Sequence, residues 1–329
     1  MSLRKKNFAK TLTMISKMIP EILTKQDPKI MIKIHQKINK LILTLKITLD
    51  GFQQTNTDLY KKIVEEMINQ DLIKMMVINI DKFEFETRKE IARIIEELIL
   101  CEEKNSVIAY FLEKEEIIES LFNKYENSGL SLICGIIIRG LSNSEKITER
   151  ILKSKYFFIL FKLSEQINFH LSTDAFSTLE KLLTKHVEIA SNFLNENYEG
   201  FFTEFDKLLF SVNYVARRQS IRLLSDLLLE RKNFQVMTKY INDSSHLQNF
   251  MNLIIDPSKG IQFDAFHVFK VLIANPKKDE QIVDILANNK KKLIDFLSQF
   301  QNENQNEHFQ DEKKLIIQKI TNTPEKKRK

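Results

Sequence analysis

The residues that most often carry chemistry are scattered along this chain of 329 residues. Its six histidines, at positions 35, 170, 186, 246, 267 and 308, never lie three to five residues from another histidine or a cysteine, which is the spacing of zinc ligands. The sequence contains no glycine-rich phosphate loop, no Gly-x-Ser-x-Gly nucleophile motif and no acidic loop with the central glycine of a calcium site. We therefore expect a protein that is not an enzyme and that holds no metal and no cofactor.

One cluster of residues is suited to binding another protein. Within NYVARRQSIRLLSDLLLERKNF, residues 213–234, the side chains of Tyr214, Arg218, Arg222 and Ser225 are spaced by four, four and three positions, so they share one face of a helix. Arginine and tyrosine are enriched among the residues that dominate protein interfaces, because each offers a large area together with directional hydrogen bonds. This face therefore predicts a partner-binding surface. The alternative is that Arg218 and Arg222 merely pair with carboxylates of a neighbouring repeat. Such surface ion pairs add little to the stability of the fold.

The helix that carries this face is one of three related segments. The small residues Ala175, Ser220 and Ala265 are 45 residues apart, and each is followed by apolar residues in the same order, as in DAFSTLEKLLTKH and QSIRLLSDLLLER. An apolar stripe at helical spacing that repeats with a period in the forties is typical of armadillo and HEAT repeats. Weaker copies occur around Ala92 and Gly135. The sequence thus predicts an all-α fold, an armadillo/HEAT-like α-α superhelix that forms a right-handed solenoid with about three helices in each repeat.

The composition favours helices and suggests the domain limits. Only six glycines and five prolines interrupt the chain, whereas tight turns between strands depend on glycine. We expect one armadillo-like domain over residues 1–320, in which residues 1–50 form capping helices, and a disordered basic tail over residues 321–329. The two cysteines lie in apolar helical patterns, and we find no signal peptide and no apolar run of membrane length. These features favour a cytoplasmic protein with reduced thiols.

The net charge of +6 and the isoelectric point near 9.0 raise an alternative function. A basic α-solenoid could bind nucleic acid or nuclear-transport cargo, and the final KKRK agrees with that. Lysine far outnumbers arginine, however, and both lysine and asparagine are abundant throughout, so the sequence marks out no basic stripe. We therefore expect no nucleic acid and no membrane among the partners.

Longer stretches of the sequence resemble the calcium-binding protein 39 family, also called the Mo-twenty-five scaffold proteins. The resemblance runs almost without gaps over residues 169–319, in segments such as NYVARRQSIRLL, LLLERKNFQVMTKYI and IQFDAFHVFKVLIANPKK, and it reappears upstream in INIDKFEFETRKEIARI. It implies an armadillo-like curved rod without catalytic activity. It also implies that the rod binds sterile-twenty-like (germinal-centre) kinases or a STRAD-like pseudokinase and holds them in an active conformation. We expect the protein itself to be a monomer.

The resemblance further implies two binding surfaces. On the concave, kinase-facing side, five residues match the family, and a sixth, Arg222, replaces a lysine with its charge kept; the five are Phe169, Tyr214, Arg218, Arg231 and Phe234. A C-terminal hydrophobic pocket of the family takes a Trp-Glu-Phe-like peptide from the partner. Met251 matches a methionine of that pocket, although the sequence pattern alone favours a place for it in the core. Asn288 stands where the family has a lysine that meets the acidic residue of the peptide.

Overall fold

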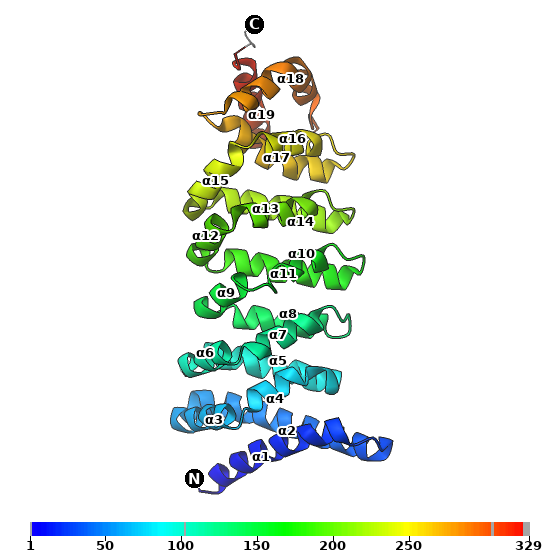
Figure 1. Ribbon diagram of the computed structural model, residues 1–329, viewed down its shortest axis with the longest axis vertical. Coiled ribbons are helices and arrows are strands. Elements are labelled where there is room, and N and C mark those ends of the chain that lie inside the picture. The colour runs from blue at the N-terminus through cyan, green and yellow to red at the C-terminus, as the bar shows by residue number, and fades with distance from the viewer. Residues whose placement is uncertain (1, 102, 304–305, 325–329) are drawn as a thin grey trace. The chain divides into compact units, whose positions relative to one another are not determined.

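The computed structural model describes residues 2–101, 103–303 and 306–324, and these residues form helices and connecting turns with no β-strand (Figure 1). Contacts between Cα atoms divide the chain into two compact units, residues 1–190 and 191–329. The α-helices of the first unit are α1 (Ser2–Thr24), α2 (Pro28–Thr55), α3 (Thr57–Asn69), α4 (Leu72–Ile78), α5 (Phe85–Leu100), α6 (Lys104–Glu113), α7 (Glu115–Tyr125), α8 (Ser131–Leu141), α9 (Glu145–Leu152), α10 (Ile159–Ser164) and α11 (Phe169–Thr184).

The next helix, α12 (Val187–Glu196), begins in the first unit and ends in the second. The α-helices that lie wholly in the second unit are α13 (Tyr198–Leu209), α14 (Tyr214–Leu229), α15 (Phe234–Ile241), α16 (Ser244–Leu253), α17 (Lys259–Ala274), α18 (Glu280–Gln299) and α19 (Glu307–Thr321). Two short 3-10 helices precede α5 and α15, over Ile80–Lys82 and Arg231–Asn233. The predicted all-α class is confirmed.

The predicted 45-residue repeat corresponds to three helices of equal length. The helices α11, α14 and α17 each contain 16 residues and begin at residues 169, 214 and 259. Each follows a residue whose side chain accepts hydrogen bonds from backbone N–H groups of the first turn, as an N-cap does, namely Asn168, Asn213 and Ser258. The small residues predicted for these helices are fully buried: Ala175, Ser220 and Ala265. The register read from the sequence is therefore the register of the fold.

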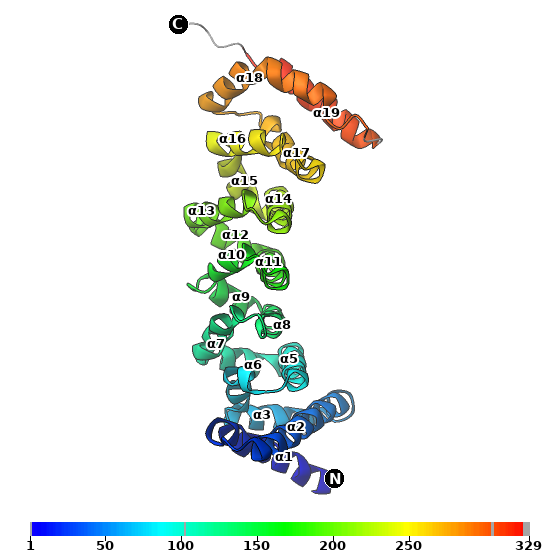
Figure 2. The same ribbon diagram turned by 90° about the vertical axis from the view of Figure 1, so that its right-hand side faces the viewer.

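Within each unit, the long helices of successive repeats pack side by side. In the first unit α2 contacts α5, α5 contacts α8, and α8 contacts α11. In the second unit α14 contacts α17, and α17 contacts α19 (Figure 2). Shorter helices separate the long ones along the chain, as predicted, so that α12 and α13 follow α11, and α15 and α16 follow α14. The pattern changes after α17, because α18 is a helix of 20 residues.

The first and last helices lie near the predicted limits of the domain. The helices α1 and α2 pack together, with Asp27 as the N-cap of α2 and Pro28 in its first turn. The second helix of this pair continues past residue 50 to Thr55. At the other end, α19 runs to Thr321, and Thr323 is still buried. Of the expected basic tail, residues 325–329 lie outside the described residues.

The interior contains both cysteines. Cys101 and Cys134 are free thiols and are buried. Burial raises the pKa of Cys134 to about 12, which disfavours the reactive thiolate at neutral pH. No helix in the described part of the chain is both long and apolar enough to cross a membrane.

Candidate functional site

The residues predicted to share one face of α14 are accessible in the second unit. Tyr214, the first residue of the helix, is 44% exposed. One and two turns later, the side chains of Arg218 and Arg222 are 37% and 62% exposed, and Ser225 is partly exposed. Because the other side of α14 is buried in the stack of repeats, this face is presented by a fixed helix. We call Tyr214, Arg218 and Arg222 the arginine face.

A single buried carboxylate of the next repeat holds both arginines. The Nε of Arg218 donates to Oδ2 of Asp264 over 2.7 Å, and the Nε of Arg222 donates to Oδ1 over 3.3 Å. The side chain of Asp264, on α17, is only 5% exposed. The hydrogen bond between Arg218 and Asp264 raises the pKa of Arg218, and the charge of Asp264 and the nearby Tyr214 hydroxyl raise it further. The pairing with a neighbouring repeat, considered above as an alternative, therefore exists, and it leaves both guanidinium groups accessible.

A glycine of α17 leaves room for this arrangement. A Cβ atom at Gly260 would lie 3.1 Å from the Tyr214 hydroxyl oxygen and 3.5 Å from Cζ of Arg218. The first distance is shorter than an ordinary carbon–oxygen contact, so a side chain here would push the tyrosine away. Glycine at this position thus leaves the Tyr214 hydroxyl its place beside the first turn of α17.

Neither Asp264 nor Gly260 was identified from the sequence as part of the candidate site. Both residues had a visible signal. The aspartate interrupts the apolar stripe of α17 directly before the small Ala265, and a charge at such a position needs a partner when it is buried. The partner could not be named, because Arg218 and Arg222 lie 46 and 42 residues away in the chain.

The predicted kinase-facing residues do not all gather at one point. Arg231 lies in the 3-10 turn after α14, and Phe234, which is 64% exposed, begins α15. Both therefore follow the end of a 16-residue helix that starts with Tyr214, and about 24 Å of helix lies between. The side chain of Asn233 donates to the carbonyl of Leu227 and so fixes the turn that carries them.

The remaining residue that was predicted to face a kinase belongs to the first unit. Phe169 is the first residue of α11, as Tyr214 is of α14, so the two aromatic residues occupy the same position of successive repeats. Its side chain is 57% exposed, and its ring meets that of His170 edge to face. An exposed aromatic residue at this repeat position is thus present in both units.

The residues assigned to a peptide pocket lie on two helices that contact each other, α16 and α18. Met251 on α16 is partly buried, and Asn288 on α18 is exposed. Near Asn288, the ammonium group of Lys290 donates to the backbone carbonyl of Thr323 over 3.0 Å. The end of the described chain therefore engages one of the three lysines that follow Asn288.

Comparison with known proteins places the chain in a family. A family model described as Mo25-like matches residues 2–324. The chain belongs to the Mo25-like family. The Calcium-binding protein 39-like protein of Homo sapiens is 37% identical over 304 residues, which cover 91% of this chain and 90% of the relative. The Mo25-like protein of Schizosaccharomyces pombe is 34% identical over 307 residues, or 92% of each chain.

A further relative of this Mo25-like chain has a similar identity and coverage. The Degreening-related gene dee76 protein of Auxenochlorella protothecoides is 38% identical over 303 residues, covering 91% of this chain and 93% of that protein. The resemblance to the calcium-binding protein 39 family is confirmed by these matches.

Among the residues that the structure describes, no group of three or more His, Cys, Asp or Glu side chains is placed to hold a metal ion.

Proposed function

We propose that this Mo25-like chain is a non-catalytic scaffold that binds a sterile-twenty-like kinase or a STRAD-like pseudokinase and stabilises its active conformation. The main support is the arginine face. Tyr214, Arg218 and Arg222 are accessible on one helix, and the family resemblance implies that these positions face the kinase, with arginine in place of lysine at position 222. Residues of these two types dominate many protein interfaces.

The proposed mechanism is a shift of population. A scaffold that binds the active arrangement of a kinase more tightly than the inactive one moves the equilibrium by that difference and by nothing else. A 100-fold preference corresponds to about 2.7 kcal/mol. Two or three anchoring side chains are enough for this, because single residues at the centre of an interface each contribute on the order of 2 kcal/mol.

A second contact of the partner is proposed at Met251 and Asn288. We infer that a Trp-Glu-Phe-like C-terminal peptide of the kinase or pseudokinase binds beside α16 and α18. The exposed Asn288 offers an amide in place of the family's lysine, so it cannot form an ion pair with the acidic residue of the peptide. We therefore expect weaker selection for that acidic residue than a lysine would give.

The double variant Arg218→Ala with Phe234→Ala tests the proposed function. The chain is titrated into purified sterile-twenty-like kinase domains and a STRAD-like pseudokinase, and the phosphorylation rate and the Kd are measured. We expect the double variant to lose stimulation while its helical circular dichroism and melting curve stay near those of the wild type, because both side chains are exposed and Arg222 still pairs with Asp264. Arg150→Ala, which removes a 51% exposed arginine of the first unit, is the matched control.

Two outcomes would count against the proposal. Stimulation by the double variant at the wild-type level would remove these residues from the site. If the chain bound RNA or DNA instead, with an affinity that falls steeply as salt increases, the basic-solenoid alternative would hold. We further propose that the protein is a monomer. We also propose that it is cytoplasmic, since both thiols are buried and free rather than bridged.

A further inference from the structure

Two aspartates occupy the same position of the repeat. Asp174 and Asp264 directly precede the small residues Ala175 and Ala265, and they are two repeat periods, or 90 residues, apart. The side chain of Asp174 is 9% exposed and that of Asp264 is 5% exposed. Each aspartate binds one or two arginines of the preceding long helix in its own unit, which is α8 for Asp174 and α14 for Asp264. The comparison shows two different uses of one structural position.

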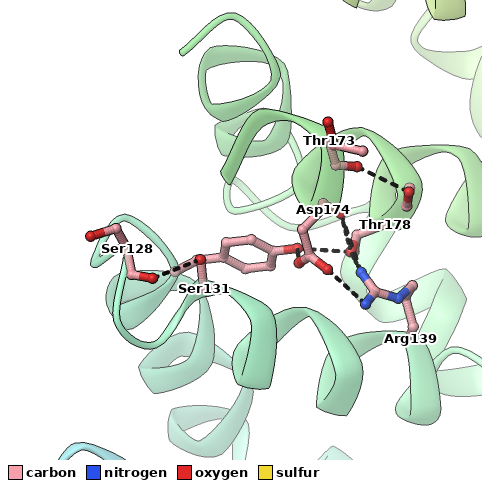
Figure 3. A network of polar contacts seen from close by, with 8 residues as sticks. Ser128, Ser131, Arg139, Thr173, Asp174 and Thr178 are labelled. Atoms are coloured by element: carbon pink, nitrogen blue, oxygen red, sulfur yellow. Dashed lines mark hydrogen bonds and ion pairs between the residues drawn. The ribbon is translucent and has the colours of Figure 1, made fainter. Parts of the chain in front are cut away.

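In the first unit, Arg139 uses its guanidinium for contacts within the protein. Nη2 of Arg139 lies 2.8 Å from Oδ1 of Asp174, and its Nη1 donates to the hydroxyl of Thr178 over 2.7 Å (Figure 3). The other carboxylate oxygen accepts a hydrogen bond of 2.5 Å from the buried Tyr125 hydroxyl. Figure 3 shows the end of the guanidinium directed at Asp174 and Thr178. This network is closed and serves the packing of α8 against α11.

In the second unit, the arginines are held by their inner nitrogen. Arg218 and Arg222 each use Nε on Asp264. In the part of the chain that the structure describes, no hydrogen bond joins the terminal Nη groups of either arginine to a carboxylate or a backbone carbonyl. Those groups are the part of the guanidinium that binds a planar oxyanion in two-pronged fashion. Two positive charges against one negative charge leave an excess of one positive charge at this surface.

On the basis of the function proposed above, we propose that Asp264 is a positioning residue of the arginine face. It fixes Arg218 and Arg222 through Nε, so that their Nη groups are arranged to receive a carboxylate side chain of the kinase or pseudokinase. One carboxylate balances the single excess charge. Gly260 supports the same arrangement, because a side chain there would crowd the Tyr214 hydroxyl beside the α17 N-terminus.

Two effects of removing Asp264 oppose each other. Without the anchor, two long side chains recover rotational freedom, and a partner must order them again on binding. Without its negative charge, the surface becomes more positive and attracts an acidic partner more strongly, but exposed charges interact weakly and are screened by salt. The ordering cost is the larger effect at physiological salt, and we expect Asp264→Asn to weaken binding roughly tenfold.

A cycle of variants tests this inference. The Kd for the kinase or pseudokinase domain is measured for the wild type, Asp264→Asn, Arg218→Ala with Arg222→Ala, and the triple variant. We expect Asp264→Asn to weaken binding in the wild-type background and to have no further effect once both arginines are gone. Asp264→Glu, which keeps the carboxylate, should recover part of the affinity. NMR of the free chain should show the arginine Nε–H signals protected from solvent exchange in the wild type and unprotected in Asp264→Asn.

The outcomes separate this inference from the proposed function. If the two arginine substitutions weaken binding and Asp264→Asn leaves it unchanged or tightens it, the positioning role is wrong and the scaffold function stands. If the arginine substitutions themselves have no effect on binding, the proposed function fails at this face. Asp174→Asn is the control for a structural role, since it should lower the melting temperature through the closed network and leave the partner's Kd unchanged.

Discussion

Gly135 shows how a single residue can be fixed by a polar network. The weak copy of the repeat around this position reflects a small residue on α8, and the structure gives the physical reason for it. A Cβ atom here would lie 1.9 Å from Oδ2 of Asp174, 2.5 Å from the Tyr125 hydroxyl and 2.8 Å from Nη1 of Arg139. All three distances are shorter than non-bonded atoms allow. The buried ion pair therefore requires glycine at position 135.

Gly135→Ala should destabilise the first unit, whereas Gly51→Ala should not. Alanine favours a helix over glycine by about 1 kcal/mol, but at position 135 the methyl group breaks a buried ion pair, which costs about 3–5 kcal/mol. Gly51 also lies in a helix of this unit, and no atom lies within 4 Å of the site of its Cβ. Chemical denaturation should show that the free energy of unfolding falls in Gly135→Ala and rises in Gly51→Ala. Equal stability of Gly135→Ala and the wild type would contradict the network.

Asp206 on α13 carries the clearest pH dependence. Burial, and then the charge of Asp243, raise its pKa from 3.8 to about 6. Its Oδ1 has no hydrogen-bond partner, and its Oδ2 lies 3.8 Å from Nδ1 of His246. Burial lowers the pKa of His246, whose ring stacks on that of Tyr240. The charged form of this aspartate is therefore disfavoured in the fold.

The raised pKa of Asp206 determines how stability changes with pH. Because the folded pKa exceeds the unfolded one, the stability from Asp206 is present below about pH 3.8 and is lost as the pH rises through about 6. We expect Asp206→Asn to gain stability relative to the wild type between pH 4.5 and 7.5, by less than about 3 kcal/mol because the carboxyl is partly exposed. A difference in melting temperature that does not change with pH would contradict this assignment.

At the scale of helices, the sequence predicted what depends on local pattern and missed what depends on distant partners. Small residues and apolar stripes are local signals, and they located α11, α14 and α17 and the buried positions Ala175, Ser220 and Ala265. The accessible face of α14 with Tyr214, Arg218 and Arg222 was predicted in the same way. The role of Asp264 depends on arginines more than 40 residues away, which no helical period indicates. The separation of Phe234 from Tyr214 likewise follows from the length of α14 and not from its pattern.

At the scale of the whole molecule, the scaffold mechanism predicts a relation between stimulation and affinity. A scaffold without chemistry of its own stimulates a kinase only by binding its active form more tightly. If saturating scaffold stimulates 100-fold, a kinase variant locked in the active arrangement should bind at least 100-fold more tightly than one locked in the inactive arrangement, a difference of about 2.7 kcal/mol. Calorimetric titration of the two locked kinases measures this ratio. The Arg218→Ala with Phe234→Ala variant should bind both forms weakly and should lose most of the difference, because these side chains are proposed to contact the partner. Equal affinity for the two locked forms, with stimulation retained, would mean that the chain acts on a step of the kinase other than its conformational equilibrium.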